Sequence, residues 1–141
     1  MSRVTSYEVF EHTADVGIRA YGNTLAELFI HAAQGMESLM VPLEQLRVVT
    51  SREVSARGHD LVSLLVEWLN ELVYLFDTEH LLFCNFAIDV IDETHVIGRA
   101  FGEPYDARRH ELGSAIKAVT WHEALVKRTE IGYQARIIFD I

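Results

Sequence analysis

Cysteine is nearly absent from this sequence, since Cys84 is the sole cysteine among 141 residues. A single thiol excludes an intrachain disulfide and a cluster of thiolate metal ligands. Cys84 also lies inside an apolar run at residues 82–86. This cysteine usage predicts a reducing compartment.

Basic residues are also few. Lys and Arg number 12 against 21 Asp and Glu, which gives a formal net charge of −9. This balance repels a phosphate backbone and removes the main source of affinity for nucleic acid. We therefore expect no general binding of RNA or DNA. An acidic surface suits instead a cation, or a protein partner with a basic surface.

The sequence lacks the features of export and membrane insertion. Residues 1–6 do not contain the apolar core of a signal peptide. The longest apolar stretch with helical periodicity is interrupted by Glu67, Asn70 and Glu71, so it does not resemble a membrane span. We expect a soluble, cytoplasmic protein that makes no membrane contact.

Familiar catalytic motifs are missing as well. The sequence contains no Gly-rich phosphate loop, no His-Glu-x-x-His and no Gly-x-Ser-x-Gly. Autonomous catalysis therefore has little support. A length of 141 residues, without internal repeats or a long polar linker, predicts one domain spanning residues 1–141.

Two segments carry the three- and four-residue periodicity of amphipathic helices. The first runs from about residue 24 to 40 and opens on Thr24 and Glu27, which have capping-box spacing. Asp60 can cap the second, whose apolar residues recur as far as Phe76. Each helix has one wide apolar face.

Elsewhere the apolar residues alternate with a period of two, as in strands. Strands are expected at residues 7–10, 18–21, 48–56, 84–90, about 95–101, 116–126 and 133–141. Hairpin turns join several of them, which favours antiparallel pairing. Two one-faced helices among such strands predict an α+β fold: a single-domain, two-layer sandwich with a largely antiparallel β-sheet and both helices on one face.

Acidic residues near both ends of the sequence are the candidate metal ligands. Asp15 stands two residues before Gly17, a spacing common in turns, and Asp140 precedes the last residue, Ile141. Taken singly, each acid has an ordinary structural explanation. If the N-terminal turn packs beside the last strand, both side chains and the Ile141 α-carboxylate converge. Such hard oxygen donors favour Ca²⁺, Mg²⁺ or Mn²⁺ over Zn²⁺, with water completing the coordination shell.

Three histidines and a lysine form a second set of candidates. His12, His110 and His122 are accompanied by Lys117, but no arrangement resembles a nucleophile with its base. Lys117 and His122 stand an odd number of positions apart, so a regular strand places them on opposite faces unless a bulge intervenes. A lone histidine in a strand is more often a hydrogen-bonded structural residue than a ligand.

Four separated motifs stand in order along the chain. They are His-Thr-Ala-Asp-Val-Gly-Ile at 12–18, Leu-Leu-Val-Glu-Trp-Leu-Asn-Glu-Leu-Val-Tyr at 64–74, Ile-Lys-Ala-Val-Thr at 116–120 and Ala-Arg-Ile-Ile-Phe-Asp-Ile at 135–141. In these residues and their spacing the chain resembles the archease family, from about residue 7 to the last residue.

The resemblance implies a protein cofactor, not an enzyme. Archeases are known as activators of the RtcB-type tRNA-splicing RNA ligase, promoting its nucleotidylation, normally with GTP, and its repeated turnover. On this resemblance, the histidine that becomes nucleotidylated belongs to the ligase and not to this chain. Archeases are also described as chaperone-like. Family members bind a divalent ion, assigned as calcium, through the Asp of the His-Thr-Ala-Asp motif and the last two residues, which correspond here to Asp15, Asp140 and Ile141.

Two other functions stay open at this point. One is a free-standing, metal-dependent hydrolase of a nucleotide or phosphoester, using His12 or His122 as base beside the same ion. The other is a general chaperone-like interaction module, which would bind many clients without any need of Asp15. Turnover by the isolated chain distinguishes the first, and suppression of aggregation of unrelated clients distinguishes the second.

Overall fold

The computed structural model describes residues 6–12 and 15–141. Thr13 and Ala14 of the His-Thr-Ala-Asp motif lie outside the described residues, as does the side chain of His12. The elements of the described chain are, in order, β1 (Tyr7–His12), β2 (Asp15–Gly22), α1 (Leu25–Met40), the 3-10 helix η1 (Leu43–Gln45), β3 (Thr50–Arg57), α2 (Leu61–Glu79), β4 (Leu81–Ile91), β5 (His95–Pro104), β6 (Ala118–Val119), β7 (Leu125–Thr129) and β8 (Gly132–Asp140).

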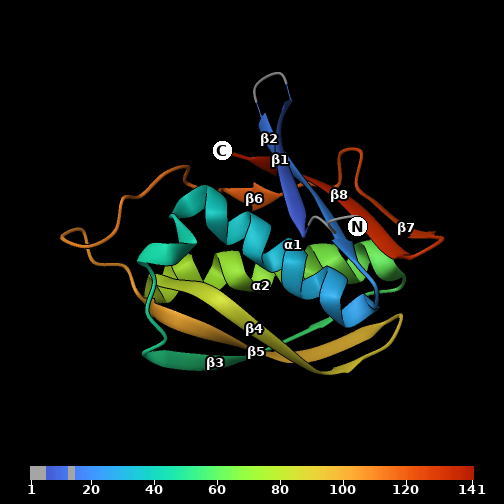
Figure 1. Cartoon of the computed structure of the whole chain (residues 1–141), viewed down its shortest axis with the longest axis horizontal. Helices are drawn as coiled ribbons and strands as arrows, with labels where there is room; N and C mark the ends of the chain where they lie inside the picture. Colours follow the sequence, from blue (N-terminus) through green and yellow to red (C-terminus); the bar gives the residue numbers. More distant parts are fainter. Residues whose placement is uncertain (1–5, 13–14) are drawn as a thin grey trace, which may run out of the picture.

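The strands form two antiparallel sheets. One has the order β1-β2-β8-β6, with β7 also paired to β8, and the other has the order β3-β5-β4. Figure 1 shows α1 and α2 between the two sheets. The predicted α+β class, with two helices and largely antiparallel strands, is confirmed. The arrangement differs from the expected two layers, because a second sheet covers the other side of the helices.

The wide apolar surface of the helices explains the second sheet. The first helix, α1, contacts β2 of one sheet and β4 of the other, and α2 contacts β3 and β6 in the same way. Along α1, Leu28, Ala32 and Met36 are buried, and so are Phe29 and Ala33. A single sheet covers one stripe of a helix, so this much apolar surface requires cover on both sides.

Both helices begin at the capping residues that the sequence predicts. Thr24 Oγ1 accepts a hydrogen bond from the Glu27 N–H at 3.1 Å. Asp60 Oδ1 accepts from the Ser63 N–H at 2.8 Å, and Ser63 Oγ accepts from the Asp60 N–H at 3.1 Å. These bonds satisfy amides that the first turn leaves unpaired. In the part of the chain that the structure describes, neither helix is long and apolar enough to cross a membrane.

The predicted strand at residues 116–126 is divided into two. Strand β6 pairs with the C-terminal end of β8, and β7 pairs with its N-terminal half. Between them the chain turns, and Glu123 adopts a left-handed backbone with φ of 52°. Lys117 and His122 therefore lie on separate segments, and the alternation rule for one regular strand does not apply to them.

A buried carboxylate anchors the irregular segment between β5 and β6. Glu103 is 6% exposed and accepts hydrogen bonds from the Arg47 N–H at 2.8 Å and from Arg109. His110 Nδ1 accepts from the Asp106 N–H at 2.9 Å, so its protonated Nε2 donates to Glu103 at 3.0 Å. Burial raises the pKa of Glu103, but these hydrogen bonds outweigh it and hold the pKa below the ordinary value. His110 is thus a structural histidine.

A second buried carboxylate sits at an irregularity of β4. Glu37 of α1 is fully buried, and its Oε1 accepts a hydrogen bond from the Phe83 N–H at 2.9 Å. That amide is beside the register shift between Phe83 and Asn85, where the ladder with β5 is interrupted. Glu37 Oε2 has no hydrogen-bond partner among the described residues. Burial raises the pKa of Glu37 to about 8, so the side chain is protonated at neutral pH.

We expect Glu37→Gln to remove a pH-dependent loss of stability. In the unfolded chain Glu37 releases its proton near its ordinary pKa, whereas the folded chain keeps the proton up to about pH 8. The free energy of unfolding therefore falls as pH rises between these two values, by at most about 1.4 kcal/mol per pH unit. Urea unfolding at about pH 5 and about pH 8 should show Glu37→Gln gaining stability over wild type at the higher pH. An equal difference at both values contradicts the protonated buried acid.

Replacing Glu103 with Ala leaves Arg109 and His110 without their buried acceptor. Removing one member of a buried charged pair leaves the other member without a partner, so the free energy of unfolding should fall by roughly 3 kcal/mol. The matched control is Glu93→Ala, an exposed acid in the turn before β5, with an expected change within about 0.5 kcal/mol. Chemical denaturation of both variants at neutral pH gives the comparison. Similar small changes in the two would show that Glu103 is not an anchor.

Candidate functional site

The register of β2 and β8 brings the two candidate acids together. Val16 pairs with Phe139, and the first residue of β2 and the last of β8 are Asp15 and Asp140. Continuing the register by one position places Asp15 opposite Asp140. On the same row, His12 pairs with Asp15 across the hairpin, and Ala118 of β6 pairs with Asp140. The strand ends that flank the N-terminal turn thus lie beside the end of the last strand, which brings the two acids together.

The two acids lie on the face of the sheet that points away from the helices. Val16 is 8% exposed and Phe139 is fully buried, so both point into the core. Side chains alternate along a strand, and Asp15 and Asp140 therefore point outward. Asp15 is half-buried and Asp140 is exposed, followed by Ile141 at 39% exposure. We call Asp15, Asp140 and Ile141 the acidic edge; Figure 1 shows the C-terminus beside β1 and β2.

Backbone hydrogen bonds hold the acidic edge in place. The Lys117 N–H donates to the Asp140 carbonyl at 2.8 Å, and the Thr120 N–H donates to the Ile138 carbonyl at 3.0 Å. Thr120 Oγ1 donates to the same Ile138 carbonyl at 2.9 Å. The backbone of β8 is therefore held in place up to Asp140 at the end of the sheet. Among the side chains that the structure describes, which do not include that of His12, none forms an ion pair with Asp15 or Asp140.

The donor chemistry of the acidic edge fits a hard divalent cation. Carboxylate oxygens are the ligands that Ca²⁺ and Mg²⁺ prefer. No group of three or more His, Cys, Asp or Glu side chains in the described ranges is placed to hold a metal. A cation bound by Asp15 and Asp140 would therefore take its remaining ligands from other groups and from water. Such a shell suits Ca²⁺, Mg²⁺ or Mn²⁺ and does not resemble the closed tetrahedral cage of structural zinc.

An apolar and cationic patch adjoins the acidic edge on the same face. The Phe10 ring covers Gly17, in the space that a side chain at position 17 would fill. The Arg19 guanidinium lies 4.4 Å from the centroid of that ring, and Arg19 pairs across the ladder with Arg136. Ile138 belongs to this outer face and is nevertheless 1% exposed. Sequence reasoning missed this patch, because only the pairing of distant strands shows that these residues are neighbours.

The other candidate residues differ in their relation to the acidic edge. His12 pairs with Asp15, and the Lys117 N–H bonds the Asp140 carbonyl. His110 belongs to the Glu103 anchor. His122 lies in the turn between β6 and β7, with Nε2 3.2 Å from Glu123 Oε2. His110 and His122 thus have different acidic neighbours, Glu103 and Glu123.

Comparisons with known proteins agree with the four sequence motifs. The sequence matches the Archease protein family (MTH1598/TM1083) over residues 7–141. The archease of Methanosarcina barkeri is 36% identical over 144 residues and that of Methanosarcina acetivorans 38%, with 99% of each chain covered in both cases.

Solved structures show the same fold. The solution structure of Methanobacterium thermoautotrophicum protein 1598 superposes with a TM-score of 0.84 at 36% identity, covering 96% of this chain and 99% of that one. A Thermotoga maritima archease, described as a possible chaperone, gives a TM-score of 0.61 at 20% identity, covering 100% of this chain and 98% of that one; at this identity the likeness shows the fold alone. With its fold, its motifs and relatives along its whole length in agreement, the chain belongs to the archease family.

Proposed function

We propose that this chain activates an RtcB-type RNA ligase, promoting guanylylation of the ligase and multiple turnover, through its acidic edge. The observation that carries the proposal is the β2–β8 register, which sets Asp15 opposite Asp140 beside the end of the chain at Ile141. Membership of the archease family supports the ligase as partner. The proposed role is that of a protein cofactor.

The acidic edge would hold a divalent cation, for which we propose Ca²⁺, with Mg²⁺ or Mn²⁺ as alternatives. The donors would be the carboxylates of Asp15, Asp140 and Ile141. A cation with few protein ligands keeps exchangeable positions that a phosphate oxygen or a partner's carboxylate can occupy. When bound, the ion would thus supply a positive charge and open coordination positions for such an oxygen.

The residues of this chain contribute position and charge. Strands β2, β8 and β6 hold the acids at one end of a paired sheet, so the carboxylates reach a docking partner without first being ordered. We propose that the acidic edge docks near the metal and nucleotide site of the ligase. There the acids would help to position a metal or ease the conformational change that accompanies guanylylation.

The metal part of the proposal predicts a loss of affinity in two single variants. Asp15→Asn and Asp140→Asn each keep the side-chain shape and remove one charged donor, so the Ca²⁺ dissociation constant should rise at least about tenfold. Asp77→Asn, at an exposed position of α2, is the matched control and should bind Ca²⁺ like wild type. Isothermal titration calorimetry measures all four proteins. Wild-type affinity in folded Asp15→Asn and Asp140→Asn would reject the site.

The ligase part is tested with purified components. The chain, its RtcB-type ligase, GTP and a divalent metal are combined, and ligase guanylylation and RNA ligation are followed under single- and multiple-turnover conditions. Wild type should accelerate both reactions, and Asp140→Ala should lose most of the acceleration. Full activation by a folded Asp140→Ala variant would reject the acidic edge as the acting surface. Absence of acceleration by wild type, or nucleotide hydrolysis by the isolated chain, would reject the activator function.

A further inference from the structure

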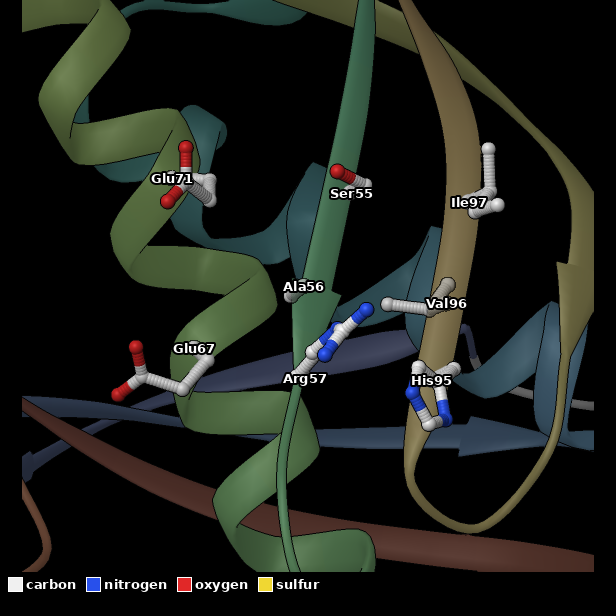
Figure 2. A pocket seen from close by; sticks show the side chains of 8 residues that line it. All are labelled: Ser55, Ala56, Arg57, Glu67, Glu71, His95, Val96 and Ile97. Carbon is white, nitrogen blue, oxygen red and sulfur yellow. The ribbon is translucent and has the colours of Figure 1, made fainter.

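A groove lies along β3, bordered by α2 and by β5, in the sheet that does not carry the acidic edge. It has a volume of about 480 Å³ and is lined by Ser55, Ala56 and Arg57 of β3, Glu67 and Glu71 of α2, and residues 95–97 of β5. Figure 2 shows α2 on one side of β3 and β5 on the other. A second hollow of about 290 Å³ shares Arg57 and Glu67 with it and extends the groove.

The edge of β3 that faces this groove has free backbone groups. Strand β3 is the outermost strand in the order β3-β5-β4, so it pairs on one side. The Gly58 N–H donates to the Thr94 carbonyl at 2.9 Å. In an antiparallel ladder alternate residues bond to the same neighbour, so Ala56 also bonds towards β5. The N–H and C=O groups of Ser55 and Arg57 therefore point away from β5, towards α2.

No other segment of the described chain occupies this edge. Among the hydrogen bonds of residues 6–12 and 15–141 outside regular helices and strands, none involves the backbone of Ser55 or Arg57. Four residues before Ser55, the Ser51 carbonyl accepts a hydrogen bond from Arg52 Nη1 at 2.9 Å, and Arg52 Nη2 donates to Glu79 Oε1 at 2.9 Å. This ion pair links β3 to α2 at one end of the edge. A free edge of this kind is a template for one more strand.

The wall opposite β3 is acidic. Glu67 and Glu71 are exposed, and neither has an ion-pair partner in the part of the chain that the structure describes. Like charges four residues apart on a helix repel each other, and a cationic ligand relieves that repulsion. Arg57 does not neutralise them, since Figure 2 shows its side chain directed over the sheet towards β5. The charge on this side of the groove therefore selects a basic ligand.

The spacing of the two acids matches that of an extended chain. Four residues of α-helix rise about 6 Å, and alternate residues of a β-strand are about 6.8 Å apart. Basic side chains at alternate positions of an added strand would thus reach Glu67 and Glu71 in turn. A second copy of this chain pairing through β3 is disfavoured, because it would bring two acidic walls together, in a chain of net charge −9.

We propose that the free edge of β3 and the acidic side of α2 bind an extended segment of a partner protein that carries basic residues at alternate positions. The segment adds a strand to β3, and its basic side chains pair with Glu67 and Glu71. Figure 1 shows β3 on the opposite side of the helices from the C-terminus. The groove is therefore a second attachment surface, separate from the acidic edge, and it does not depend on the ligase proposal.

The experiment measures binding of a fluorescein-labelled peptide in which lysine alternates with threonine. The comparison peptide has glutamate in place of lysine. Fluorescence anisotropy should show saturable binding of the lysine peptide and none of the glutamate peptide. Glu67→Gln/Glu71→Gln should weaken binding at least about fivefold. The matched control, Glu44→Gln/Glu130→Gln, makes the same change in net charge at exposed positions that line neither hollow, and it should bind like wild type.

Two further measurements separate strand addition from general attraction of charge. In ¹⁵N spectra, the amides of Ser55 and Arg57 should shift on peptide addition and exchange with solvent more slowly. Ser55→Pro removes an N–H that faces the groove, and an edge strand tolerates this substitution. The variant should bind the lysine peptide more weakly than wild type. The proposal would be overturned by any of three results: the lysine peptide does not bind saturably, the two double variants weaken its binding equally, or the Ser55 and Arg57 amides do not shift. Dimerisation through β3, seen by light scattering, would also overturn it.

Discussion

The pairing of β2 with β8 is the interaction on which the rest of this structure depends. It joins strands from opposite ends of the sequence and turns Val16, Ile18 and Phe139 into the core, where they pack against the helices. Because side chains alternate, the same register turns Asp15 and Asp140 outward on one row. A slip of one residue would bury these acids and expose the apolar set, so the stability of the core maintains the geometry of the acidic edge.

Two buried acids show how the fold treats polar groups away from that edge. Glu103 remains charged because an amide, an arginine and a histidine bond to it. Glu37 has one amide partner and keeps its proton. Both lie where regular strand pairing stops. Glu103 holds the segment that leads to β6, and Glu37 accepts a hydrogen bond from an amide at the irregularity in β4. The acids at the surface are the ones left available to cations and partners.

Local patterns were enough to predict much of the fold. The helix starts at Thr24 and Asp60 and the strand at 84–90 follow from capping and periodicity, which act within a few residues. The second sheet did not follow, because a wide apolar helix face does not say what covers it. The division of 116–126 depends on a left-handed residue at Glu123 that no composition signal marks. Asp15 and Asp140 were identified as oxygen donors, but their alignment is a product of long-range pairing. The Glu103 anchor and the free edge of β3 depend on the same kind of distant contact.

The central claim is that Asp15 and Asp140 form one site because β2 and β8 align them. A double-mutant cycle of Ca²⁺ binding, using Asp15→Asn, Asp140→Asn and the combined variant, tests it most directly. Ligands of one ion act together, so the combined variant should lose little more affinity than either single variant. Strictly additive losses in folded variants would contradict the shared site, since separate and independent carboxylates behave in that way.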